Sequence, residues 1–109
     1  MKETILNIYL VINSGIVKEF RAVAYDEEGS DDEKITFLKS RAKQDFQNSV
    51  HFDAPMDKKG NFMPYNKFYK LEKRGIQFQL FEEIFEAFKV PDKPLVCVTP
   101  VVDGEIYSQ

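Results

Sequence analysis

The chain has 109 residues, of which 43% are hydrophobic and 30% charged, and its net charge is −3. This length fits one domain, and the apolar content, with only 5 Gly and 5 Pro, excludes collagen-like, low-complexity and disordered chains. The small negative charge gives no whole-molecule attraction to nucleic acid or to acidic lipid. We therefore expect a single globular domain over residues 1–109.

The first elements in the chain read as a β-hairpin. Residues 4–12 are rich in β-branched and aromatic side chains and place apolar residues on both faces, which is typical of a central strand. Residues 13–15, Asn-Ser-Gly, are a turn signal, and residues 16–25 alternate as a returning strand. The apolar run is too short for a membrane span or a secretory signal, so we expect no membrane partner.

Residues 31–48 are expected to form one uninterrupted helix. Ser30 and Glu33 have the spacing of a capping box, in which each side chain satisfies a backbone N–H of the other residue. Behind this cap, apolar side chains recur at intervals of three and four residues, which is the helical period. These side chains are Ile35, Leu38, Ala42 and Phe46.

The second half of the chain is less regular. Residues 50–54 suit a short strand, and residues 57–60 suit a loop or hairpin tip. Residues 76–90 are expected to form a helix whose apolar side chains span an arc of about 200°. A helix that packs on one sheet needs an apolar arc of little more than 100°. Either residues 50–75 cover the surplus, or residues 76–88 form a homodimer surface. Residues 95–102 and 105–107 read as a final strand and a short return. The fold class is thus α+β, with an N-terminal β-hairpin and two amphipathic helices packed on a largely antiparallel sheet of three to five strands.

The single Cys97 and the single His51 exclude several kinds of site. They can form neither an internal disulfide nor the usual four-ligand zinc site. The lone thiol favours a reducing, cytoplasmic setting. His51 and Asp53 can share one face of a strand, but no nucleophile motif and no glycine-rich nucleotide loop accompanies them. The sequence therefore predicts no metal, no cofactor and no enzymatic activity.

An acidic cluster is the first candidate site. Residues 26–33 carry six carboxylates and no basic side chain. Such a cluster caps a helix and hydrates a loop, or it binds the basic surface of a protein partner. The residues assigned to partner binding are Asp26, Glu27, Glu28, Asp31 and Asp32.

A basic segment interleaved with aromatic residues is the second candidate. Residues 58–74 have a net charge of +5, and single-strand binders combine such cations with stacking rings. The opposing interpretation is that the rings belong to the core and the lysines to the solvated outside. The candidate nucleic-acid-binding residues are Lys58, Lys59, Phe62, Tyr65, Lys67, Tyr69, Lys70, Lys73 and Arg74.

Taken with the missing catalytic motifs, these two segments favour a non-enzymatic binding protein. The leading hypothesis is a small accessory, regulatory or inhibitory module that occupies a partner's surface, steered by the acidic cluster and anchored by exposed aromatic side chains. The alternative is a single-stranded nucleic-acid-binding protein that uses residues 58–74.

Overall fold

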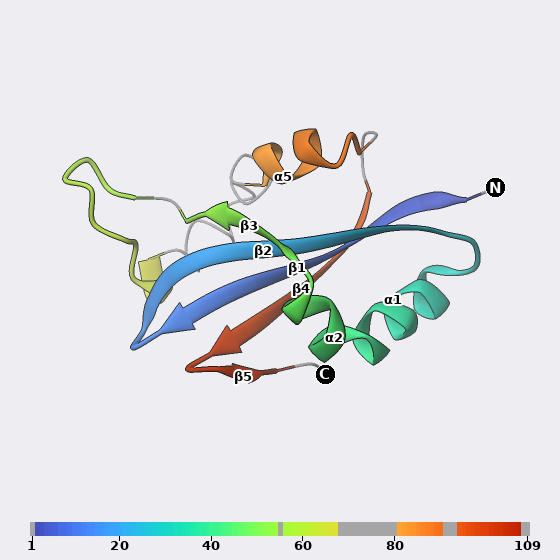
Figure 1. Ribbon diagram of the computed structural model, residues 1–109, viewed down its shortest axis with the longest axis horizontal. Coiled ribbons are helices and arrows are strands. Elements are labelled where there is room, and N and C mark those ends of the chain that lie inside the picture. Colours follow the sequence, from blue (N-terminus) through green and yellow to red (C-terminus); the bar gives the residue numbers. More distant parts are fainter. Residues whose placement is uncertain (1, 55, 68–80, 91–93, 108–109) are drawn as a thin grey trace.

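The computed structural model describes residues 2–54, 56–67, 81–90 and 94–107. They form an α+β fold on one five-stranded sheet with the order β3-β2-β1-β4-β5 (Figure 1). The elements in chain order are β1 (Glu3–Asn13), β2 (Ile16–Glu27), α1 (Asp31–Ser40), α2 (Ala42–Gln47), β3 (Val50–Asp53), α5 (Glu82–Ala87), β4 (Leu95–Val102) and β5 (Glu105–Ile106).

The N-terminal hairpin is confirmed. β1 and β2 pair antiparallel over nearly their full length, from Glu3 opposite Glu27 to Asn13 opposite Ile16. The connecting residues Ser14 and Gly15 have φ values of 51° and 74°. Two successive positive φ values are characteristic of the tight turn whose twist matches that of the paired strands.

The sheet is mixed, so the prediction of a largely antiparallel sheet is only partly confirmed. β1 and β4 run parallel, while the other three neighbouring pairs are antiparallel. A parallel neighbour needs a crossover connection, which the chain between β3 and β4 supplies. β1 is the middle strand, as the apolar residues on both of its faces predicted.

Helices cover both faces of the sheet, because alternate side chains of a strand point to opposite faces. On one face, β1 and β4 contribute Tyr9 and Val101 to a cluster with Ala42 and Phe46 of α2. The other face carries the larger cluster, covered by α5 and by part of the segment after β3 (Figure 1). Its buried members are Leu6, Ile8, Leu10, Ile12, Val17, Phe20, Ala22, Phe52, Ala54, Phe81 and Ile84.

The prediction of one uninterrupted helix over 31–48 is wrong. The helix ends at Ser40 and begins again at Ala42, with Arg41 between them at φ −103° and ψ 3°. Two buried side chains of β1 donate hydrogen bonds to carbonyl groups of the helices at this point. Asn7 Nδ2 donates to the Leu38 carbonyl at 3.0 Å, and Tyr9 Oη donates to the Ala42 carbonyl at 2.9 Å. Side chains that insert into the helical hydrogen-bond ladder kink a helix, which accounts for the break.

A buried carboxylate holds α2 against the sheet. Asp45 is 2% exposed and accepts hydrogen bonds from Tyr25 Oη and, at 3.4 Å, from Asn7 Nδ2. Arg41 Nε lies 3.5 Å from the same carboxylate and donates to Tyr25 Oη at 3.0 Å. Burial, followed by the hydrogen bond to Asp45, raises the pKa of Tyr25. The kinked helix is therefore anchored by polar contacts as well as by apolar packing.

The described part of the predicted helix 76–90 is α5, and residues 76–80 lie outside the described residues. Phe81 and Ile84 are buried, and the Phe81 ring meets Phe20 of β2 edge-on at 5.5 Å. The ring centres of Phe88 and of Phe52 in β3 lie 6.0 Å apart. Over residues 81–90, the wide apolar arc therefore packs against the sheet, including its edge strand β3. A homodimer surface over residues 76–88 stays a prediction.

Candidate functional site

Carboxylates gather where β1 begins, β2 ends and α1 begins. Strand pairing places Glu3 opposite Glu27 and Thr4 opposite Asp26, and α1 starts four residues after β2 ends. The structure thus brings the predicted partner-binding residues together and adds Glu3 to them. We call this group the acidic end. Its members are Glu3, Asp26, Glu27, Glu28, Asp31, Asp32 and Glu33.

The capping box is confirmed, and it accounts for part of this acidity. Ser30 Oγ accepts the Glu33 N–H at 3.2 Å, and Glu33 Oε1 accepts the Ser30 N–H at 3.3 Å. Asp31 and Asp32 lie in the first turn of α1, where the helix dipole favours negative charge. Glu27 and Glu28 precede the cap and contribute nothing to it.

Neighbouring side chains neutralise the acidic end only in part. Lys34 Nζ lies 2.8 Å from Glu3 Oε2, and its side chain is only 4% exposed. The hydrogen bond from Lys34, and then its charge, lower the pKa of Glu3. Thr4 Oγ1 donates to Asp26 at 3.0 Å. Lys2 is adjacent to Glu3 in the chain and adds a second positive charge near the seven carboxylates.

Like charges stand directly across the hairpin at this end. Glu3 and Glu27 are cross-strand partners, and such a pair lowers the stability of a sheet. Lys34 relieves Glu3, but its ammonium is buried and does not reach into solvent. The excess of carboxylates therefore makes the local field negative.

The basic-aromatic segment is described only as far as Lys67. Lys58, Lys59 and Lys67 are exposed, as is Phe62 at 37%. Tyr65 is half-buried and packs against the larger core cluster, so its ring belongs partly to the core. Four of the predicted nucleic-acid-binding residues lie outside the described residues. They are Tyr69, Lys70, Lys73 and Arg74.

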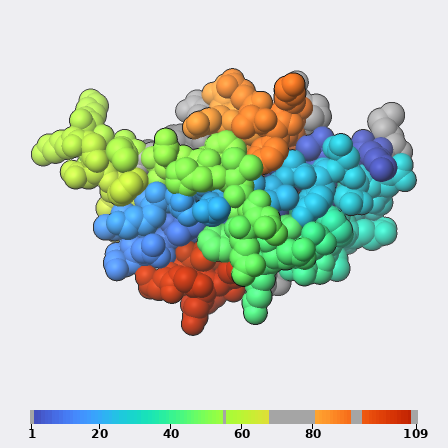
Figure 2. Space-filling view, viewed as in Figure 1, coloured from blue at the N-terminus to red at the C-terminus, as the bar shows by residue number. Residues whose placement is uncertain are grey.

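Residues 56–62 form a hairpin that projects from the body, and we call it the arm. Met56 and Phe62 bridge antiparallel at its base, which confirms the expected hairpin tip at 57–60. Beyond it, the Met63 carbonyl accepts the Val17 N–H at 3.0 Å, tying the arm to the start of β2. Figures 1 and 2 show the arm at one end of the longest molecular axis and the acidic end at the other, along an extent of 45 Å.

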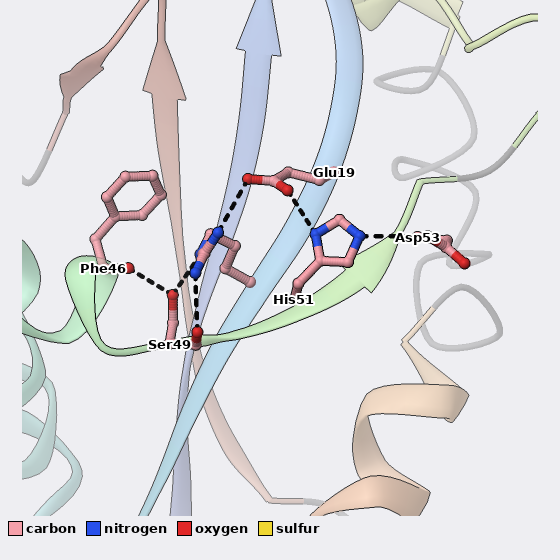
Figure 3. A network of polar contacts seen from close by, with 6 residues as sticks. Glu19, Phe46, Ser49, His51 and Asp53 are labelled. Atoms are coloured by element: carbon pink, nitrogen blue, oxygen red, sulfur yellow. Dashed lines mark hydrogen bonds and ion pairs between the residues drawn. The ribbon is translucent and has the colours of Figure 1, made fainter.

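A polar cluster lies on one face of β2 and β3 (Figure 3). Arg21 donates to Ser49 Oγ at 2.7 Å through Nε and to the Ser49 carbonyl at 3.0 Å through Nη2. Its Nη1 lies 3.4 Å from Glu19, whose other oxygen lies 2.5 Å from His51 Nδ1. His51 Nε2 lies 3.3 Å from Asp53. The pairing of His51 with Asp53 was expected from their spacing, and the structure adds Glu19.

This cluster fastens β3 to β2 through hydrogen bonds and ion pairs. A neutral imidazole carries one N–H, so both carboxylates accept hydrogen bonds from His51 only when the ring is protonated. The Ser49 hydroxyl is also occupied, because it donates to the Phe46 carbonyl at 2.6 Å. Among residues 2–54, 56–67, 81–90 and 94–107, no three His, Cys, Asp or Glu side chains are placed to hold a metal ion.

A shallow groove of about 570 Å³ separates α2 from β5. Phe46 and Ile106 supply its apolar lining, and Lys43 and Glu105 its charges. The volume suits a small ligand, but such sites need several convergent polar groups, and the two opposite charges here do not single out one ligand chemistry.

Sequence reasoning missed three contributors to these surfaces. Glu3 joins the acidic end, and Glu19 joins the His51 cluster, only through strand register. Met56 is 52% exposed because the arm leaves the body of the domain. The alternation of β2 pointed Glu19 away from the apolar face, and this was the one available signal for its position.

Comparison with protein families, with curated proteins and with solved structures finds no match to this chain. Within the part of the chain that the structure describes, no helix is long and apolar enough to cross a membrane.

Proposed function

We propose that this protein is a small, non-enzymatic protein-binding module, an accessory, regulatory or inhibitory factor whose acidic end binds a basic surface of its partner. The observation that carries the proposal is the excess of carboxylates at that end, where Glu3 forms an ion pair with Lys34. Glu3 and Glu27 oppose each other across the hairpin, and the helix cap makes no use of Glu27 or Glu28. Like charges placed across a hairpin lower the stability of the sheet, and departures from local rules of this kind are expected at functional sites.

Electrostatics assigns the acidic end a particular role in binding. Complementary charges raise the association rate and select the partner more than they add to affinity. Rim charges of this kind act through the long-range field, so their effect weakens with salt. The acidic end should therefore govern how fast the partner docks.

The experiment compares two variants with equal loss of charge. Asp26→Asn, Glu27→Gln and Glu28→Gln together remove three charges from the acidic end, and their amides keep hydrogen-bond acceptors. The control removes three exposed carboxylates from α5, by Glu82→Gln, Glu83→Gln and Glu86→Gln. Wild type and both variants serve as bait in parallel affinity purifications, and partners recovered by wild type are then purified for kinetics.

We expect the acidic-end variant to associate roughly tenfold more slowly at low salt, with a smaller change in dissociation. Its folding free energy should stay within about 0.5 kcal/mol of wild type, because the substitutions lie on the surface. The α5 variant should associate nearly as fast as wild type. Equal slowing of both variants would reduce the effect to net charge and reject the acidic end as the docking surface.

The nucleic-acid alternative has support from Lys58, Lys59 and Phe62, which are exposed together on the arm. It has less support from Tyr65, whose ring packs against the core. Single-strand binding relies on several stacking rings along one groove, and the described part of residues 58–74 supplies one exposed ring, Phe62. We therefore place the protein-binding function first.

A further inference from the structure

The arm presents exposed apolar side chains at the end of the molecule opposite to the acidic end. Met56 is 52% exposed and Phe62 is 37% exposed, and the two face each other across the base of the hairpin. In Figure 2 the arm projects from the rounded body of the domain. Met and aromatic residues are enriched in protein interfaces, and Met adapts its shape to different partners.

A β-bulge brings a cation to this apolar pair. Val11 of β1 pairs with Glu19 and the next residue, Ile12, pairs with Val17, so Lys18 is the extra residue of β2. A bulge re-aims the side chain it carries. Lys18 Nζ lies 5.3 Å from the centre of the Phe62 ring, within the range of a cation–π contact.

The tip of the arm is held in one conformation before any partner binds. Asp57 Oδ1 accepts the backbone N–H groups of Lys59 and Asn61, each at 2.9 Å. The Asp57 N–H donates to the Asn61 carbonyl at 2.9 Å, and the Gly60 N–H donates to the Asp57 carbonyl at 3.0 Å. A preorganised loop loses less conformational entropy on binding, which raises affinity.

We propose that the arm is a second docking surface, which binds an acidic protein surface that presents an apolar side chain among carboxylates. Phe62 and Met56 supply the apolar contact. Lys18 lies against the Phe62 ring, Lys58 and Lys59 add positive charge at the exposed tip, and the one carboxylate of the arm, Asp57, is engaged with backbone N–H groups. This charge is complementary to an acidic partner and unlike that of the acidic end.

A protein partner suits the arm better than a single-stranded nucleic acid. Lys18 covers part of the Phe62 ring, and Met56, the more exposed of the two apolar residues, has no aromatic face on which a base can stack. The inference goes beyond the proposed function, since the arm and the acidic end lie at opposite ends of the molecule (Figure 1).

The test uses a phage-displayed library of short random peptides, selected on the folded protein. We expect enriched peptides to carry Asp or Glu on both sides of an aliphatic or aromatic residue. Fluorescence anisotropy with the enriched peptide should show roughly tenfold weaker binding to a Met56→Ser, Phe62→Ser double variant. Lys18→Gln should weaken binding about two- to fivefold and reduce its salt dependence.

Val50→Ser is the matched control, because Val50 is 51% exposed but lies on β3, outside the arm. It should bind the peptide as wild type does, and the acidic-end variant should do so too, which separates this proposal from the proposed function. Thermal unfolding verifies that each variant is folded. The proposal is overturned if no acidic-apolar sequence is enriched, if the double variant binds the peptide unchanged, or if labelled oligothymidylate binds the arm more tightly than the peptide.

Discussion

Replacing Tyr9 with Phe tests how much one buried hydroxyl contributes to holding α2 on the sheet. Tyr9 is fully buried in β1, and its hydroxyl donates to the Ala42 carbonyl at 2.9 Å. Phe fills the same space apart from the hydroxyl oxygen, and it keeps the edge-on contact with the Phe46 ring at 5.3 Å. The substitution therefore removes the hydrogen bond and leaves the apolar packing in place.

The magnitude follows from burial at both ends of the bond. Ala42 is only 3% exposed, so water has little access to its carbonyl once the hydroxyl is gone. Ala42 is the first residue of α2, where a carbonyl also accepts an N–H within the helix, so the substitution removes one of two hydrogen bonds to this oxygen. Such a buried hydrogen bond contributes about 1 kcal/mol. With an unfolding entropy of about 2.1 cal/mol/K per residue, a chain of 109 residues should lose about 4 °C in Tm.

Calorimetry and urea unfolding measure this loss directly, with Tyr107→Phe as the control. Tyr107 is 53% exposed, and its hydroxyl lies 3.4 Å from Glu105, so the control should change stability by less than about 0.5 kcal/mol. Burial, followed by the charge of Asp45, raises the pKa of Tyr9. Tyr9 therefore contributes its full stabilisation below a pH of about 10, the pKa of tyrosine in the unfolded chain. This stabilisation is lost as the pH rises through the higher pKa of Tyr9 in the folded protein.

A Tyr9→Phe protein as stable as the control would refute the reasoning. It would mean that the Tyr9 hydroxyl does not help to hold α2 on the sheet.

Two further predictions concern the helix cap and the arm. Ser30→Ala should destabilise the protein by about 1 kcal/mol in urea unfolding, because the first turn of α1 loses the acceptor for the Glu33 N–H. An unchanged urea midpoint would show that the cap does not contribute to stability. The hydrogen bond from the backbone N–H of Asn61 is the main cause that lowers the pKa of Asp57. The Asp57 carboxylate therefore stabilises the arm fully above a pH of about 3.9, the pKa of aspartate in the unfolded chain. This stabilisation is lost as the pH falls through the lower pKa of Asp57 in the folded protein. The amide chemical shifts of Lys59 and Asn61 should follow that transition in NMR; Asp57→Ala should abolish it, whereas Asp57→Asn keeps an acceptor and should preserve the turn at all pH values.

Local patterns predicted the elements whose causes are local. The N-terminal hairpin follows from strand alternation and from a turn with Gly at a positive φ, and the capping box from two residues three apart. The helix break at Arg41 has no such signal, because its cause lies in Asn7 and Tyr9, more than thirty residues upstream. The apolar stripe runs through the break without Gly or Pro. The parallel pairing of β1 and β4 likewise depends on how the chain crosses over.

The same difference between local and long-range causes explains which residues of the candidate surfaces the sequence predicted. The acidic run was found because it is continuous in sequence, whereas Glu3 reaches it only through the register of the hairpin. The exposure of Met56 and the bulge that aims Lys18 at Phe62 are properties of the folded chain and cannot be read from composition. Charge segregation was apparent in the sequence, but its arrangement along the longest axis was not.

The salt dependence of the association rate tests the central claim most directly. The rate constants of wild type, the acidic-end variant and the α5 control are measured against one partner across a series of ionic strengths. We predict that wild type and the α5 control show the same steep decline with salt, whereas the acidic-end variant begins roughly tenfold lower and declines less. An acidic-end variant whose rate and salt slope match those of wild type would contradict the claim and leave the acidic end with only its role in capping α1.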